Sequence, residues 1–297
     1  MSCVLYGYGT GSQRSNQHRE QICRHGLCRI YACGDGCMTV KEAGSPNRRE
    51  EGSSAGCLAL QSGEEVTKRT ILYLITAVVL IAATYMVFTS PAINPGVRPP
   101  LLSDDDWQNQ VQSYRIFYFH VPLAWVSYLA FFMVFVASIR YLQTSHINWD
   151  VLAASSAEIG AVFCALNLVS GMLWAKGAWG IYWDWTPRLT FQLILFLLYA
   201  AYVTLRRAME SESRARSSAV FGIIAFVAVP MSYLSIKLWP PLLHPDLTSE
   251  GGGIDSPIIV YTLLINILAY TLLYLSLLTI RMDNERVSHE STSSRNP

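Results

Sequence analysis

Six long apolar segments dominate the second part of the chain. Their approximate bounds are 70–89, 116–140, 151–173, 189–206, 217–238 and 257–280. A helix that crosses the hydrocarbon core of a bilayer needs about 20 mostly apolar residues. Turn and breaker residues lie between the segments, as in Pro240-Pro241 and Gly251-Gly252-Gly253. The pattern therefore predicts an all-α polytopic membrane protein with six transmembrane helices.

The basic residues fall in alternate connections, which indicates the orientation of the chain. Cytoplasmic connections of membrane proteins are enriched in Lys and Arg. The basic residues that follow this alternation are Lys68, Arg69, Arg140, Arg206, Arg207, Arg214, Arg216, Arg281 and Arg286. We therefore expect both termini to be cytoplasmic and three loops, about 90–115, 174–188 and 239–256, to face outward.

Residues 1–66 differ in composition from the rest of the chain. They hold ten of the 19 glycines and six of the seven cysteines, with no long apolar run. Such a composition favours disorder, and the absence of an apolar signal-peptide core argues against export of this segment. We predict a polar, disordered N-terminal extension at 1–66, a six-helix membrane domain at 67–282 and a polar C-terminal tail at 283–297.

Four cysteines of the extension are spaced without the tight CxxC pairs of a typical zinc module. They are Cys23, Cys28, Cys33 and Cys37, with His18 and His25 nearby. A cytoplasmic segment is kept reduced, which also disfavours a disulfide framework. Initiation at Met38 is an alternative reading of the gene, and detecting a peptide from residues 1–37 by mass spectrometry would exclude it.

The charge content narrows the class of protein. Only 14% of residues are charged and the net charge is +1, whereas soluble domains have about 25% charged residues. A soluble enzyme, a disordered protein and a nucleic-acid binder are therefore poor hypotheses.

An outward loop concentrates aromatic side chains. Four tryptophans and one tyrosine lie within residues 174–185, together with Gly180 and followed by Arg188. An aromatic belt at the membrane interface is one interpretation. The density of rings beside a glycine and a cation also suits a large planar ligand with carboxylates, because rings stack on its faces and Arg pairs with its acids.

Only two of the six histidines, His120 and His244, fall on the predicted outer side. A single histidine is most often structural, but two on the face that holds the aromatic loop suggest axial ligands for haem iron.

Three motifs together carry a resemblance to a known family. They are YRIFYFHVPLAW at 114–125, WGIYWDWTPRLT at 179–190, and the segment from Trp239 to His244. Over residues 68–282 the chain resembles the CcmC-type, WWD-domain haem-handling proteins of cytochrome c maturation.

The resemblance implies a multi-pass protein of the cytoplasmic membrane that binds haem b at its outer face. It implies delivery of haem to a membrane-anchored haem chaperone together with an ABC-type complex, with no enzymatic chemistry and no catalytic residue. His120 and His244 would ligate the iron. With the loop and its neighbours, the expected haem-binding residues are Trp174, Trp179, Gly180, Tyr182, Trp183, Asp184, Trp185, Arg188, Arg115 and Trp239.

One position departs from the family pattern. The family loop usually has Asp directly after its last Trp, where this chain has Thr186, and Asp184 stands two positions earlier. Whether Asp184 takes over that role is left open. Within the third span, Glu158 is an ionisable group for which we expect a partner or water, rather than haem.

Two functions of other classes stay open. A membrane electron-transfer subunit would place further histidines inside facing helices, and redox cycling with quinol would reveal it. A small-molecule permease would have broken helices and ionisable groups at the midplane, and solute flux independent of haem would reveal it.

Overall fold

The computed structural model describes residues 21–23, 26–33, 37–42, 51–93, 100–101, 103–238 and 256–293. The chain divides into two units, Met1–Ile71 and Leu72–Pro297. The predicted site residues Trp239 and His244 lie outside the described residues.

The first unit contains an antiparallel sheet of three strands in the order β1-β2-β3. The strands are β1 (Gln21–Cys23), β2 (Gly26–Cys33) and β3 (Cys37–Glu42), with Cys33 opposite Cys37. The disorder that we expected over the whole of residues 1–66 stays a prediction. Ile30 and Tyr31 in β2, and Thr39 and Val40 in β3, are β-branched or aromatic residues that favour strands.

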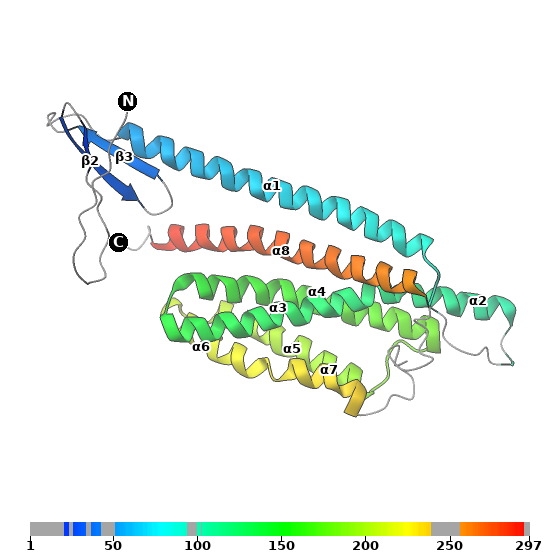
Figure 1. Ribbon diagram of the computed structural model, residues 1–297. Helices are drawn as coiled ribbons and strands as arrows, with labels where there is room; N and C mark the ends of the chain where they lie inside the picture. The colour runs from blue at the N-terminus through cyan, green and yellow to red at the C-terminus, as the bar shows by residue number, and fades with distance from the viewer. Residues whose placement is uncertain are drawn as a thin grey trace. The chain divides into compact units, whose positions relative to one another are not determined.

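The described elements of the second unit are helical (Figure 1). They are α1 (Glu51–Thr89, which begins in the first unit), α2 (Asp104–Ser113), the 3-10 helix η1 (Tyr114–Ile116), α3 (Phe117–Thr144), α4 (Ile147–Trp179), α5 (Pro187–Ala208), α6 (Ser211–Ala225), α7 (Ala228–Leu238) and α8 (Pro257–Ser293). Six segments of the described chain are long and apolar enough to cross a membrane, which confirms the predicted spans. The cytoplasmic placement of both termini stays a prediction.

The fifth span consists of two helices instead of the continuous helix that we expected. Pro230 has no N–H to donate to the carbonyl of Phe226. That carbonyl accepts instead from the N–H of Val229 at 3.0 Å, and the N–H of Val227 donates to the carbonyl of Ile224 at 3.2 Å. These tighter bonds separate α6 from α7.

The centre of the bundle is the pair α3 and α4, joined through Ser145 and His146. Helix α8 packs on both, α5 on α4, α6 on α3 and α7 on α5. Phe131 of α3 stacks on Tyr199 of α5, with ring centroids 3.5 Å apart. Helix α4 begins beside the end of α3 and ends beside its start. The residues at the two ends of the bundle differ.

Helices α1 and α8 are linked by a series of polar contacts. The hydroxyl of Tyr73 lies 3.1 Å from that of Thr279, and those of Thr76 and Ser276 lie 2.9 Å apart. Near the other end, the hydroxyls of Ser90 and Thr262 lie 2.6 Å apart. In lipid, such interhelical hydrogen bonds contribute to helix association.

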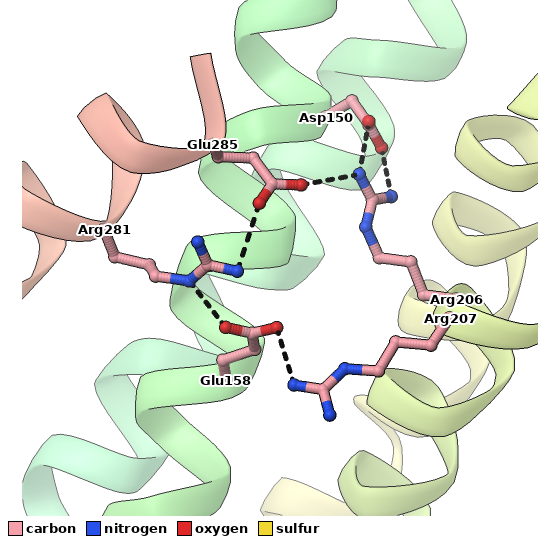
Figure 2. A network of polar contacts seen from close by, with 6 residues as sticks. All are labelled: Asp150, Glu158, Arg206, Arg207, Arg281 and Glu285. Carbon is pink, nitrogen blue, oxygen red and sulfur yellow. Dashed lines mark hydrogen bonds and ion pairs between the residues drawn. The ribbon is translucent and has the colours of Figure 1, made fainter. Parts of the chain in front are cut away.

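A network of charged side chains joins α4, α5 and α8 at the end where α4 begins (Figure 2). Glu158 accepts a 2.6 Å hydrogen bond from Arg281 and lies 3.4 Å from Arg207. Arg281 also pairs with Glu285 at 3.1 Å. The ionisable group predicted inside the third span therefore has two cationic partners, and it lies toward the end of α4 opposite the tryptophan-rich loop.

Candidate functional site

Three helix ends meet at the opposite end of the bundle and bring separate sequence motifs together. His120 lies in the first turn of α3, Trp174 and Gly180 lie at the end of α4, and Arg188 lies in the first turn of α5. The guanidinium of Arg188 is within electrostatic range of both His120 and Tyr128. The structure thus places the histidine motif and the aromatic loop at one site.

His120 is buried, with 8% of its surface exposed. Its Nδ1 lies 2.9 Å from the hydroxyl oxygen of Ser170 and 3.3 Å from Nδ2 of Asn167. The Asn167 amide also donates to the main-chain carbonyl of His120 at 2.9 Å. These contacts hold His120 in a defined orientation. A histidine that only lies at the membrane interface would not need them.

Trp174 lies at the centre of an aromatic cluster. It makes edge contacts with Tyr114, Phe117 and His120, with ring centroids 5.4, 6.4 and 5.7 Å apart. Edge-to-face pairs of this kind contribute about 0.5–1.5 kcal/mol each beyond the apolar area they bury. The cluster fixes both the end of α4 and the imidazole beside it.

Gly180 ends α4 in the left-handed conformation, with φ of +76°. Only glycine adopts this φ without steric cost from a Cβ. The N–H of Gly180 donates to the carbonyl of Lys176 at 3.1 Å, and the Lys176 ammonium donates back to the Gly180 carbonyl at 2.8 Å. The same ammonium lies 5.3 Å from the ring centre of Tyr182. These contacts set the direction in which the loop leaves the helix.

The loop presents a pair of tryptophans in an edge contact. The rings of Trp183 and Trp185 are 5.5 Å apart with an interplanar angle of 80°. Trp185 is 73% exposed and Tyr182 is also exposed, whereas the indole nitrogen of Trp183 is buried and has no hydrogen-bond partner among the described residues. The loop therefore offers an exposed apolar surface and a buried donor.

Thr186 occupies the N-cap position of α5, directly before Pro187 at the first helical position. An N-cap favours Asp, Asn, Ser or Thr, so Thr is compatible with the position where the family loop usually has Asp. The Thr186 side chain makes no capping hydrogen bond. Asp184 is partly exposed in the loop, and its proposed role stays a prediction.

Arg115 is held by protein acceptors. Its Nη1 donates to the carbonyls of Val87 and Ser90 at 2.7 and 2.6 Å, and its Nε donates to Gln112 at 2.6 Å. These bonds satisfy carbonyls at the end of α1 that lack partners within the helix. The proposed pairing of Arg115 with a ligand carboxylate stays a prediction.

Two of the remaining predicted residues, Trp239 and His244, lie outside the described residues, and the side chain of Trp179 does too. The pairing of His120 with His244 therefore stays a prediction. Among the described residues, no group of three or more His, Cys, Asp and Glu has the arrangement of a metal site.

The structure adds three residues of α4 that the sequence analysis did not single out. Asn167 and Ser170 contact His120, and a Cβ at Gly171 would lie 3.0 Å from the imidazole Cε1. Their spacing with Trp174, at i, i+3, i+4 and i+7, places all four on one helix face. A polar Asn in an apolar span was the signal available in the sequence.

Comparison with known proteins identifies the family of the chain. A family model described as heme exporter protein C (CcmC) matches residues 64–296. The heme exporter protein C of Bradyrhizobium diazoefficiens is 34% identical over 223 residues, which cover 74% of this chain and 80% of that protein. Those of Paracoccus denitrificans and Escherichia coli K12 are 32% and 34% identical, over 62% and 60% of this chain and 77% and 72% of theirs.

Proposed function

The chain belongs to the heme exporter protein C (CcmC) family, and we propose that it binds haem at the outer face of the cytoplasmic membrane and delivers it for cytochrome c maturation. The family supports a role in haem handling. The outward site, the ligands and the delivery step are the parts that we propose.

The observation that carries the proposal is the position of His120. It lies buried beside Trp174, at the bundle end from which the tryptophan-rich loop emerges, and within electrostatic range of Arg188. An imidazole, an apolar aromatic surface and a cation match the iron, the macrocycle and the propionates of haem.

In this mechanism, the aromatic loop holds the macrocycle through apolar and stacking contacts. His120 and His244 would ligate the iron, and Arg188 would pair with a propionate. The unpartnered indole N–H of Trp183 supports a polar group of the ligand nearby, because a buried donor without an acceptor costs about 1–3 kcal/mol.

Delivery requires that the axial bonds exchange. The cargo leaves unchanged, so the protein makes and breaks coordination bonds but catalyses no covalent reaction on haem. A membrane-anchored haem chaperone would accept haem at the outer surface, where Trp185 and Tyr182 are exposed, and an ABC-type complex would act with this protein in the release.

Spectroscopy of protein purified from haem-replete membranes tests the proposal. We expect a Soret band and a low-spin spectrum with two histidine ligands, and we expect His120→Ala and His244→Ala each to reduce the haem content. The matched control is His146→Asn, which removes an exposed imidazole at the other end of α4 and keeps an N-cap residue. Wild-type protein without haem, or unchanged spectra in both site variants, would refute the ligand assignment.

A further inference from the structure

We propose that Ser170 and Asn167 are positioning residues that hold His120 as the Nδ1–H tautomer, so that Nε2 is the nitrogen presented to iron. This inference rests on the proposed function of His120 and adds which atom binds, what orients it and why the bond can exchange.

The hydrogen bonds of Ser170 determine the tautomer. Its hydroxyl lies 2.9 Å from the carbonyl oxygen of Asn167, one turn earlier in α4, and 2.9 Å from Nδ1 of His120. A carbonyl oxygen only accepts, so the single hydroxyl hydrogen is donated to Asn167. The hydroxyl oxygen is then an acceptor toward His120, which requires a proton on Nδ1 and leaves a lone pair on Nε2.

Asn167 holds the main chain of the same residue. Its Nδ2 lies 2.9 Å from the carbonyl oxygen of His120 but 3.3 Å from Nδ1. An amide nitrogen only donates hydrogen bonds. When Nδ1 is protonated, Nδ2 of Asn167 can donate to the carbonyl of His120 but not to Nδ1, and the shorter of the two distances is the one to the carbonyl. Asn167 thus fastens α3 to α4 at the residue whose ring Ser170 orients.

Gly171 and Trp174 bound two further sides of the imidazole. A Cβ at Gly171 would lie 3.0 Å from Cε1, so only glycine leaves the ring in its present place. The Trp174 ring makes an edge contact at 5.7 Å. Four residues on one face of α4 therefore determine the orientation of the His120 imidazole, which belongs to α3.

The nature of the acceptor fits a protein that releases its cargo. A partner on the second nitrogen of a ligating histidine fixes the tautomer and raises the basicity of the ligand. A hydroxyl is neutral, so it polarises the imidazole less than a carboxylate would. The hydrogen bond from His120 to Ser170 therefore orients the imidazole for iron. It does not make the imidazole the strong electron donor that a carboxylate partner would, which would favour permanent binding.

The direct test reads the tautomer in the haem-free protein. In protein labelled with ¹⁵N-histidine, with the His120 signals assigned by their loss in His120→Gln, we expect a neutral ring protonated at Nδ1. We expect Ser170→Ala to shift these signals and Ser170→Thr, which keeps the hydroxyl, to restore them. A wild-type ring protonated at Nε2 would overturn the proposal whatever the haem content.

Haem binding supplies a second measurement. Second-sphere partners of metal-bound histidines are worth about 10–100-fold in affinity, so we expect Ser170→Ala to weaken haem binding at least tenfold and to shift the haem reduction potential, with rescue by Ser170→Thr. The matched control is Ser127→Ala, because Ser127 likewise donates to the carbonyl three residues earlier, that of Ala124, at 2.8 Å. Ser127 is the more buried of the two serines.

The outcomes separate the two proposals. If His120→Ala loses haem while Ser170→Ala binds like wild type and keeps its reduction potential, the positioning role is wrong and the ligand assignment stands. If His120→Ala retains the wild-type spectrum, the ligand assignment itself fails. If Ser170→Ala does not fold, Ser170→Cys is measured beside Ser170→Thr, because a thiol is a weaker acceptor and should give an intermediate affinity.

Discussion

Arg206 of α5 donates two hydrogen bonds to the carboxylate of Asp150 in α4, each 2.6 Å long (Figure 2). Both side chains are buried, with 9% and 4% of their surface exposed. The geometry is the bidentate pairing for which a planar guanidinium is suited. The pair joins the first turn of α4 to the last turn of α5, so it fixes the end of the bundle away from the aromatic loop.

Removal of one partner should be costly because the other charge then stays buried. We expect Asp150→Ala to lower the free energy of unfolding by about 3–5 kcal/mol, measured by reversible unfolding in mixed micelles. The control is Arg207→Ala. The Arg207 side chain is 74% exposed, and its distance to Glu158, 3.4 Å, is longer than those of the buried pair. Its loss should stay within about 1 kcal/mol, and equal losses for the two variants would contradict the distinction.

The six spans were predictable because a bilayer sets the length of an apolar helix, a constraint that acts on each segment separately. The break in the fifth span was not predicted, although Pro230 is visible in the sequence. Whether a proline interrupts a helix depends on which groups take up the freed carbonyl, here the N–H of Val229, and that is settled by the folded backbone.

The site was predictable where rare residues cluster along the chain, as in the loop from Trp174 to Trp185. Ser170 and Asn167 escaped notice because their importance arises from contact with a different helix, 50 and 47 residues away from His120. Arg115 shows the converse limit. Its charge suggested a ligand carboxylate, a pairing that stays a prediction, whereas its hydrogen bonds to the carbonyls of Val87 and Ser90 depend on the folded chain.

The two kinds of tryptophan should respond differently to truncation. We expect Trp185→Ala to weaken haem binding while changing the free energy of unfolding by less than about 0.5 kcal/mol, as for other exposed positions. Trp174→Ala removes a buried aromatic ring beside His120 and should lower stability by about 3–5 kcal/mol, as well as haem content. Haem titration and unfolding of the same preparations separate the two effects. A Trp185→Ala variant with full affinity would remove this ring from the binding surface.

Gly180 should be sensitive to substitution for a conformational reason alone. A Cβ at this position meets no atom within 4 Å, but φ is +76°. We therefore expect Gly180→Ala to cost about 1–2 kcal/mol of stability and to loosen the loop that carries Trp183 and Trp185. Gly180→Asn should cost less, because Asn tolerates the left-handed conformation. Unfolding in micelles and tryptophan fluorescence measure both effects, and equal stability of the Ala and Gly forms would argue against a strained C-cap.

Arg188 and Arg115 can be distinguished with a ligand that lacks carboxylates. Hydrogen bonds to charged groups are worth about 1.5–3 kcal/mol, so Arg188→Gln should weaken haem binding about tenfold or more. The same variant should bind haem dimethyl ester as wild type does, because the ester offers no anionic propionate. Arg115→Gln should instead lower stability, since the carbonyls of Val87 and Ser90 lose their donor, and should leave the ratio of haem to ester affinity unchanged. If that ratio changes in Arg115→Gln and not in Arg188→Gln, the propionate partner is Arg115.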